Sequence, residues 1–323
     1  MYSITTIIVT YKRQKELEDC IYAILNQTIL PKELIIIDNG KLEFVKNLCK
    51  KIKLDKRAQK INIIYVESDE NSLTVGKNKG IQLAKGNLIS IIDDDMIIEK
   101  DYYKFILEVF DKNSDALGVM GFNTIKRKNA LLNKITKIYN RIFLISANTN
   151  DYCNLWPSLG NTYPLNIKNK IIPCMWLSGQ STFKKSILLK IKPDNNLKKY
   201  CWNEDIDLSH RIYKKYPNTL FLTGKARYFH EGTTNVRMPK KDLIYMEAVY
   251  DIYLFNIHFG GYFENTLIFI WSKFGRILKN FIIYLFNFNL KNIWYLFCAQ
   301  FYVLINLKKI KNKDISFFNN TLR

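Results

Sequence analysis

The stretch LISIIDDDMIIEK, from Leu88 to Lys100, places three consecutive aspartates between two aliphatic runs. The apolar residues before the aspartates are typical of a strand that is buried on both faces. Carboxylates this close raise one another's pKa unless a positive group lies among them, and a hard divalent cation is a common partner. The stretch therefore predicts a buried strand that ends at a candidate metal site.

The same strand pattern occurs three more times in the first hundred residues. The runs are ITTIIVTY (4–11), ELIIIDNG (33–40) and INIIYVES (61–68), and segments with helical spacing lie between them. Strands that alternate with helices predict a doubly wound α/β sheet, in which ligands bind beyond the carboxyl ends of the strands. Thr10, Asp38 and the three aspartates all lie at such ends, so we expect one crevice to collect them.

The composition is that of a basic globular protein. Of the 323 residues, 48% are hydrophobic and 14% aromatic, which excludes a disordered chain. The formal net charge of +20 comes mostly from Lys spread through the sequence, and it favours phosphate-bearing ligands or an anionic membrane surface as partners. Because no basic helix, zinc-finger spacing or aromatic RNA-binding motif accompanies the charge, we expect no nucleic-acid partner.

Cysteine usage and the N-terminus both favour the cytoplasm. The six cysteines include no CxxC pair, and several lie in apolar surroundings, where a reduced thiol packs as a small hydrophobe. The first charged residues come too early for a signal peptide, so the N-terminus is better explained as an opening strand.

Two regions depart from the α/β pattern. Residues 123–170 are less regular, and we interpret them as an insertion over the site. After about residue 234, aromatic and aliphatic helices punctuated by Lys and Arg run to Leu307. We therefore expect an α/β domain over residues 1–234 and a helical region over residues 235–323.

Six ordered motifs give the chain a resemblance to a known family. They are VTYKR (9–13), QTILPKELIIIDNG (27–40), GKNKGIQLAKGNLISIIDDD (76–95), WLSGQ (176–180), NEDIDLSHR (203–211) and HEG (230–232). The set resembles the family 2 glycosyltransferases over about the first 230 residues. The resemblance implies the GT-A fold, which is a Rossmann-like, mostly parallel sheet with flanking helices, and it places the insertion near the acceptor side.

The resemblance implies a nucleotide site at the strand ends. Asp38 would accept a hydrogen bond from a uracil ring, and Lys77 would take the place of an arginine that holds phosphate or base. The residues assigned to nucleotide binding are Thr10, Tyr11, Asp38, Lys77, Asn78 and Asp93. The alternatives are an ordinary turn former for Asp38 and a plain glycine turn before a helix for the segment around Lys77.

Asp93 and Asp95 resemble the family's DxD motif, which holds Mn²⁺ or Mg²⁺ against the diphosphate of the donor. Such a metal neutralises the charge that develops on the departing nucleotide diphosphate. His230 stands where many relatives place a histidine that contacts the metal or the diphosphate. The alternatives are a solvated acidic turn for the two aspartates and a structural role for His230.

The Glu204-Asp205 pair is the second acidic centre. By resemblance, Asp205 is the general base that removes the proton of the acceptor hydroxyl, and Glu204 holds it in place or tunes its pKa. The alternative is an acidic cluster that favours the N-terminus of a helix. Trp176 and Gly179 resemble the acceptor-side loop of the family, with a core tryptophan as the alternative.

The C-terminal region favours a membrane surface. Its longest uncharged block, residues 292–307, is shorter than the roughly eighteen to twenty apolar residues that a spanning helix needs. A module that lies in the membrane interface, with Lys and Arg facing lipid phosphates, fits better. The alternative is a helical subdomain that packs on the sheet or on another subunit.

Together, these features predict an inverting, metal-dependent glycosyltransferase. We expect it to move a sugar, most simply from a UDP-sugar, to a hydroxyl of a glycan or lipid-linked acceptor in the synthesis of a bacterial envelope polysaccharide, at the inner face of the cytoplasmic membrane. The alternatives are an inactive sugar-nucleotide-binding module and a basic nucleic-acid-binding protein. A phosphatase is disfavoured because the acidic run follows the fourth strand and precedes Met96.

Overall fold

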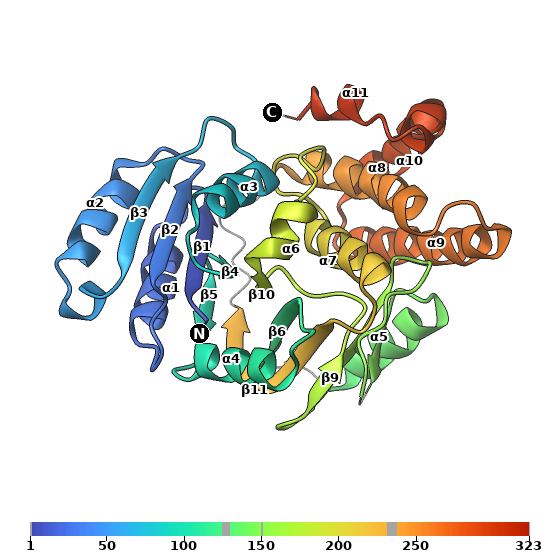
Figure 1. Cartoon of the computed structure of the whole chain (residues 1–323). Coiled ribbons are helices and arrows are strands. Elements are labelled where there is room, and N and C mark those ends of the chain that lie inside the picture. The colour runs from blue at the N-terminus through green and yellow to red at the C-terminus, as the bar shows by residue number, and fades with distance from the viewer. Residues whose placement is uncertain (1, 125–129, 150, 231–237, 323) are drawn as a thin grey trace. The chain divides into compact units, whose positions relative to one another are not determined.

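The chain forms two compact units, which are considered separately (Figure 1). The computed structural model describes residues 2–124, 130–149, 151–230 and 238–322. The first, which we call the sheet unit, comprises Met1–Lys126 and Asn166–Val236; the second, the helical unit, comprises Arg127–Leu165 and Arg237–Arg323. The predicted insertion thus contributes most of its residues to the helical unit, and the predicted boundary at residue 234 lies outside the described residues.

The sheet unit contains alternating strands and helices in its first half, as predicted. Its elements are β1 (Ile4–Thr10), α1 (Lys15–Leu25), β2 (Glu33–Asp38), α2 (Glu43–Lys53), β3 (Asn62–Glu67), α3 (Leu73–Leu83), β4 (Leu88–Asp93), β5 (Met96–Ile98), α4 (Tyr102–Lys112), β6 (Gly118–Asn123), β9 (Ile171–Pro173), β10 (Ser181–Lys184), α6 (Lys185–Lys190), α7 (Glu204–Lys215) and β11 (Leu220–His230).

The strands of this unit form one mixed sheet. Its order is β3-β2-β1-β4-β10-β6-β11-β5, with β9 paired to β11. The first four strands are parallel neighbours, whereas β10 runs antiparallel to both β4 and β6. The sequence pattern therefore predicted the parallel half of the sheet. The second half is mixed, because β11 runs parallel to β6 and antiparallel to β5 and β9.

Helices cover both faces of the parallel half. Ile8 of β1 belongs to the apolar core that includes Leu17 and Ile21 of α1. On the other face, α3 approaches β1 through glycine: a Cβ on Gly80 would lie 2.6 Å from Cγ2 of Ile7. Because side chains alternate along a strand, the buried β1 serves both layers and fixes α3 against the sheet.

Strand register brings the polar strand ends to one edge of the sheet. Thr10 of β1 lies opposite Asp38 of β2, and Val9 lies opposite Asp93 of β4. On the antiparallel side, His230 of β11 lies opposite Met96 of β5, the residue after Asp95. Chain segments far apart in sequence thus supply the polar groups of a single edge, as the sequence predicted for the first two strands and β4.

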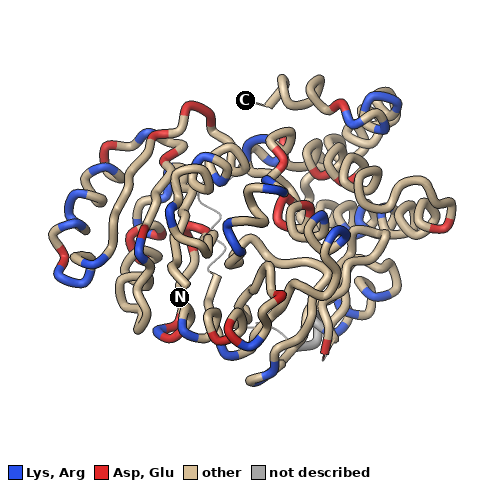
Figure 2. Tube along the Cα trace, in the orientation of Figure 1, with Lys and Arg blue, Asp and Glu red and all other residues tan. Residues whose placement is uncertain are grey.

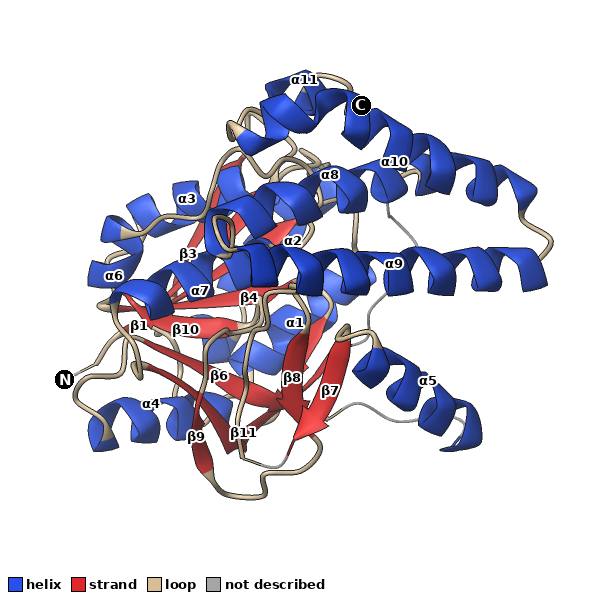
Figure 3. Ribbon diagram, turned by 90° about the vertical axis from the view of Figure 1, so that its right-hand side faces the viewer, coloured by secondary structure: helices blue, strands red, loops and turns tan. Residues whose placement is uncertain are grey.

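The helical unit contains three long helices, α8, α9 and α10, which have 19, 24 and 22 residues (Figure 3). Its elements are α5 (Ala130–Ile142), β7 (Ser146–Thr149), β8 (Asn161–Pro164), α8 (Lys240–His258), α9 (Phe263–Phe286), α10 (Leu290–Lys311) and α11 (Ser316–Asn319). The buried Asp251 of α8 lies 3.0 Å from Lys273 Nζ of α9. Of the described helices, none has an apolar stretch long enough to cross a bilayer.

Figure 2 shows Lys and Arg distributed along the trace of both units. This distribution agrees with the sequence, in which Lys and Arg are scattered throughout the chain. The basic residues therefore come from elements throughout the described chain.

We expect Gly80→Ala to destabilise the sheet unit, because its added Cβ would overlap the fully buried side chain of Ile7. Overpacking of this kind lowers the free energy of unfolding by about 1–3 kcal/mol. Urea denaturation measures the change. Gln82→Ala, at an exposed position of the same helix, is the control and should change stability by less than about 0.5 kcal/mol. Equal effects of the two variants would contradict the close approach of α3.

Candidate active site

Asp93, Asp95 and His230 lie together at the polar edge of the sheet. Ligand atoms from the three side chains all lie within 4.8 Å of one another. His230 Nε2 lies 2.9 Å from Asp95 Oδ1, and this hydrogen bond raises the pKa of His230. Two carboxylates and an imidazole are a donor set that suits Mn²⁺, and the carboxylates also suit Mg²⁺. The structure thus brings together the three residues predicted as metal ligands.

Arg13 is a site residue that the sequence analysis missed. Its NH1 lies 2.7 Å from Asp94 Oδ1 and 3.0 Å from Asp95 Oδ2. Thr10 Oγ1 also donates to Asp94, at 2.7 Å. Burial raises the pKa of Asp94 to about 6, although Arg13 and Thr10 oppose the shift. Arg13 therefore supplies positive charge among the three aspartates. Its place in VTYKR, just after the first strand, could have indicated that it belongs to the site.

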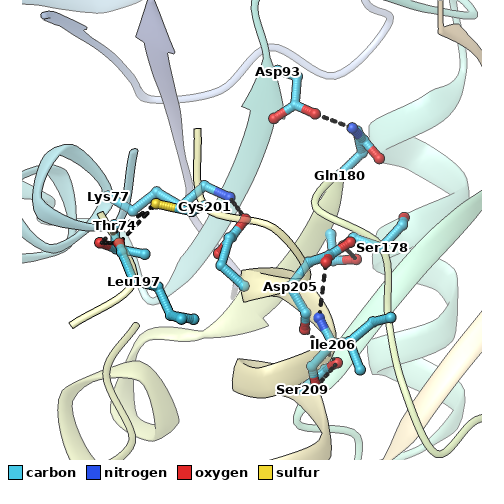
Figure 4. A network of polar contacts seen from close by, with 12 residues as sticks. Thr74, Lys77, Asp93, Ser178, Gln180, Leu197, Cys201, Asp205, Ile206 and Ser209 are labelled. Carbon is cyan, nitrogen blue, oxygen red and sulfur yellow. Dashed lines mark hydrogen bonds and ion pairs between the residues drawn. The ribbon is translucent and has the colours of Figure 1, made fainter. Parts of the chain in front are cut away.

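The WLSGQ loop reaches the same cluster (Figure 4). Gln180 Nε2 donates a hydrogen bond to Asp93 Oδ2, a contact that the sequence did not predict. A Cβ on Gly179 would lie 3.6 Å from that same oxygen, so the backbone there is close to the cluster. Trp176 is only 7% exposed, which supports the core alternative. Its stacking on an acceptor sugar, like the acceptor-side role of Gly179, stays a prediction.

Asp38 organises the turn that follows β2. Its Oδ1 accepts from the backbone N–H of Gly40 at 2.8 Å and of Lys41 at 3.0 Å, and its Oδ2 accepts from that of Leu42 at 2.8 Å. The hydroxyl of Tyr65 donates to the same Oδ2 at 3.2 Å. The geometry is that of a turn former with a fully buried side chain. A hydrogen bond from Asp38 to uracil stays a prediction.

The other predicted nucleotide residues contact protein groups in this structure. Asn78 Nδ2 donates to the carbonyl of Pro193 at 2.9 Å and to Asn195 Oδ1 at 2.6 Å. Tyr11 is partly exposed, with Lys12 Nζ 5.2 Å from the centre of its ring. The nucleotide contacts of these residues stay predictions.

The two acids at the start of α7 have different surroundings. Glu204 is buried and forms an ion pair with the buried Lys77 of α3. Asp205 is more exposed than Glu204, and its Oδ1 accepts from the backbone N–H of Ile206 at 2.9 Å.

Electrostatics connects Asp205 to the metal cluster. Burial raises the pKa of Asp205 against the opposing charge of Lys77, and the charge of Asp93 raises it further. A raised pKa makes a carboxylate a stronger base near neutral pH. The candidate base is therefore under the electrostatic influence of Asp93, a member of the candidate metal cluster.

The family model that matches is "Glycosyl transferase family 2", over residues 5–187 of the 323-residue chain. The chain belongs to glycosyl transferase family 2. This confirms the family that the six ordered motifs indicate. The matched segment includes the strand ends of β1, β2 and β4, and it ends just after β10.

Curated proteins match this chain over part of their length. A segment is 30% identical over 110 residues to glycosyltransferase GlyA of Streptococcus pneumoniae, and it covers 32% of this chain and 15% of GlyA. Another is 28% identical over 136 residues to the poly-β-1,6-N-acetyl-D-glucosamine synthase of Staphylococcus aureus, with 42% of this chain and 32% of the synthase covered. The chain thus spans a third or less of the length of these two proteins.

Solved structures with little sequence identity share the fold. GalNAc-T7, solved with UDP, GalNAc and Mn²⁺, has a TM-score of 0.56 at 13% identity. The match covers 85% of this chain and 55% of the GalNAc-T7 chain. Residues 1–349 of Staphylococcus aureus TarS have a TM-score of 0.52 at 14% identity. This match covers 84% of this chain and 70% of the TarS chain. These likenesses confirm the predicted α/β class, the GT-A fold and the additional C-terminal helices.

We expect Asp95→Asn to weaken Mn²⁺ binding at least about tenfold, because it removes an anionic ligand from the cluster. The measurement is the electron paramagnetic resonance signal of free Mn²⁺ during titration in the presence of UDP. Asp69→Asn, whose side chain is 97% exposed, is the control and should bind Mn²⁺ as the wild type does. Unchanged Mn²⁺ affinity in Asp95→Asn would remove Asp95 from the metal site.

Proposed function

We propose that this family 2 protein is an inverting, metal-dependent glycosyltransferase that moves a sugar from a UDP-sugar to a hydroxyl of a glycan or lipid-linked acceptor in cell-envelope polysaccharide synthesis. The observation that carries the proposal is the meeting of Asp93, Asp95 and His230 at one edge of the sheet, with Asp205 at the start of α7 under the electrostatic influence of Asp93. A carboxylate base beside a divalent-cation site is what sugar transfer from a nucleotide diphosphate requires.

Similar proteins support the donor and the pathway. GalNAc-T7 was solved with UDP and Mn²⁺, and the Pyrobaculum calidifontis mannosyltransferase PcManGT, similar in fold with a TM-score of 0.52, was solved with GDP-Man and Mn²⁺. The named relatives include the Staphylococcus aureus poly-β-1,6-N-acetyl-D-glucosamine synthase and the putative teichuronic acid glycosyltransferase TuaG of Bacillus subtilis. We choose UDP over GDP because uracil is the base implied by the motif at Asp38.

The donor half of the site would hold the diphosphate. Asp93, Asp95 and His230 would bind Mn²⁺ or Mg²⁺, and Arg13 holds Asp95 in place from the other side, at 3.0 Å. The bound cation would neutralise the negative charge that develops on the nucleotide diphosphate as it leaves.

The acceptor half would supply the base. A carboxylate oxygen of Asp205 would take the proton of the acceptor hydroxyl while the hydroxyl oxygen attacks the anomeric carbon from the face opposite the diphosphate. One carbon–oxygen bond forms as the bond to the diphosphate breaks, so the configuration inverts. The raised pKa of Asp205 favours this proton transfer.

We expect Asp205→Asn to lower kcat by about 10²–10⁴-fold, because an amide cannot accept the proton. Affinity for UDP with Mn²⁺ should stay unchanged. The assay measures UDP release from UDP-glucose, UDP-N-acetylglucosamine and UDP-N-acetylgalactosamine with a bacterial envelope glycan fraction as acceptor. Asp115→Asn, at an exposed position, is the control.

Two results would contradict this function. A wild-type protein that binds UDP with Mn²⁺ but transfers no sugar from any donor would be a binding module. A wild-type protein that binds no nucleoside diphosphate would not be a glycosyltransferase of this kind.

We also propose that the helical unit lies on the inner face of the cytoplasmic membrane. Trp294, Phe301 and Leu304 of α10 are 68%, 65% and 66% exposed, and their spacing places them on one face of the helix. Leu296 and Val303, on the opposite face, are buried. Large apolar side chains in such a stripe favour an apolar environment outside the unit.

Charge selects an anionic lipid surface as the occupant of this stripe. No acidic residue occurs between Glu264 and Asp314, whereas Lys291 lies at the start of α10 and Lys308 and Lys309 lie at its end. An apolar stripe between lysines suits acyl chains with anionic headgroups at both ends.

We expect the triple variant Trp294→Ser, Phe301→Ser and Leu304→Ser to lose binding to phosphatidylglycerol vesicles. Burial of each large side chain contributes about 1.5–3 kcal/mol, so affinity should fall at least about tenfold. Vesicle flotation measures it, and Leu54→Ser, which changes an 85% exposed leucine of the sheet unit, is the control. Flotation of the triple variant like the wild type would contradict the proposal, as would wild-type self-association without vesicle binding.

A further inference from the structure

The turn before Asp205 holds an unfavourable backbone conformation. Lys199, Cys201 and Asn203 have φ angles of 58°, 54° and 59°. This left-handed region is uncommon for residues other than glycine, and three such residues lie within five positions. Strained backbone of this kind persists only where the surrounding structure holds it. Because α7 begins at Glu204, whatever holds this turn also sets the position of Asp205.

Helix α3 supplies contacts that hold the turn. The backbone N–H of Leu73 donates to the carbonyl of Lys199 at 3.1 Å. Thr74 Oγ1 donates to the carbonyl of Leu197 at 2.8 Å, and Cys201 Sγ donates to the same carbonyl at 2.7 Å. Figure 4 shows Thr74, Leu197 and Cys201 side by side. One face of α3 thus binds the turn before α7 begins.

The ion pair between Lys77 and Glu204 holds the far end of the turn. Lys77 is 2% exposed and Glu204 is 5% exposed. Burial lowers the pKa of Lys77, but the carboxylates of Glu204 and Asp93 outweigh this effect, so the ammonium persists. Within the described part of the chain, the buried Glu204 Oε2 has no hydrogen-bond partner. Lys77 is therefore the group that compensates the charge of Glu204, and the ammonium that does so is buried.

The same helix is fixed against the strand ends that carry the donor half of the site. Cβ atoms on Gly76 and Gly80 would lie 2.8 Å from Val9 and 2.6 Å from Ile7 of β1. Strand β1 in turn pairs with β4, which ends at Asp93. A rigid path therefore runs from the metal cluster through β1 and α3 to the first turn of α7.

We propose that Lys77 is a positioning residue for the general base and not a ligand of the nucleotide. Through Glu204 it fixes the first turn of α7, and with it the carboxylate of Asp205, at a set distance from the metal cluster. This inference rests on the proposed function, and it assigns Lys77 a role different from the phosphate or base contact expected from the sequence.

The test compares Lys77→Met with Lys79→Met, which changes a lysine two positions along α3 whose side chain is 34% exposed. In Lys77→Met, kcat should fall about 10²-fold, the loss that a misplacement of about 1 Å brings. The KM for the donor and the affinity for UDP with Mn²⁺ should stay within about twofold. Lys77→Arg, which keeps the charge, should recover at least about tenfold of the lost kcat, and Lys79→Met should match the wild type.

The outcomes separate this inference from the proposed function. Loss of UDP affinity in Lys77→Met with kcat retained would make Lys77 a nucleotide ligand and overturn the inference, as would wild-type kinetics. If Lys77→Met fails to fold, the double variant Lys77→Met with Glu204→Gln removes the uncompensated carboxylate. In that variant, low kcat with intact UDP affinity supports the inference, and wild-type kcat overturns it. A wild-type protein that binds no UDP with Mn²⁺ contradicts the proposed function instead.

Discussion

The repulsion among Asp93, Asp94 and Asp95 is the constraint on which the site depends. Three carboxylates at the end of a buried strand remain close only where positive or donating groups surround them. Arg13 and Thr10 hold Asp94, while His230 and Gln180 hold its two neighbours. Asp94 binds Arg13 and Thr10, whereas Asp93 and Asp95 lie with His230 in the three-residue group that could hold a divalent cation. The proposed metal ligands are thus an alternating pair within a continuous acidic run.

The parallel half of the sheet also connects this cluster to the proposed acceptor side. Fully buried β1 lies between β2 and β4, and glycine lets α3 approach it closely. The contacts of α3 with the turn before α7 then relate the candidate base to the strand ends. The proposed donor and acceptor groups therefore lie within one compact unit, and the family 2 match extends over residues 5–187.

The sequence predicted what local pattern determines. The apolar runs identified β1 to β4, and their parallel order placed Thr10, Asp38 and Asp93 at one edge. The pairing in the second half of the sheet does not follow from the local pattern, because its neighbours are distant in sequence: β10, of four residues, lies between β4 and β6, and β11 lies beside β6. Gln180 was missed for the same reason. The partner of Lys77 lies 127 positions away, a separation that no periodicity reveals.

A crystal structure with UDP and Mn²⁺ tests the central claim most directly, through the anomalous scattering of manganese. One strong peak should lie in coordination contact with Asp95 and His230, with the diphosphate on its open side and Asp205 facing the space where the sugar would sit. A manganese peak at any other group of side chains, or a nucleotide bound away from the ends of β1 and β4, would contradict the shared site.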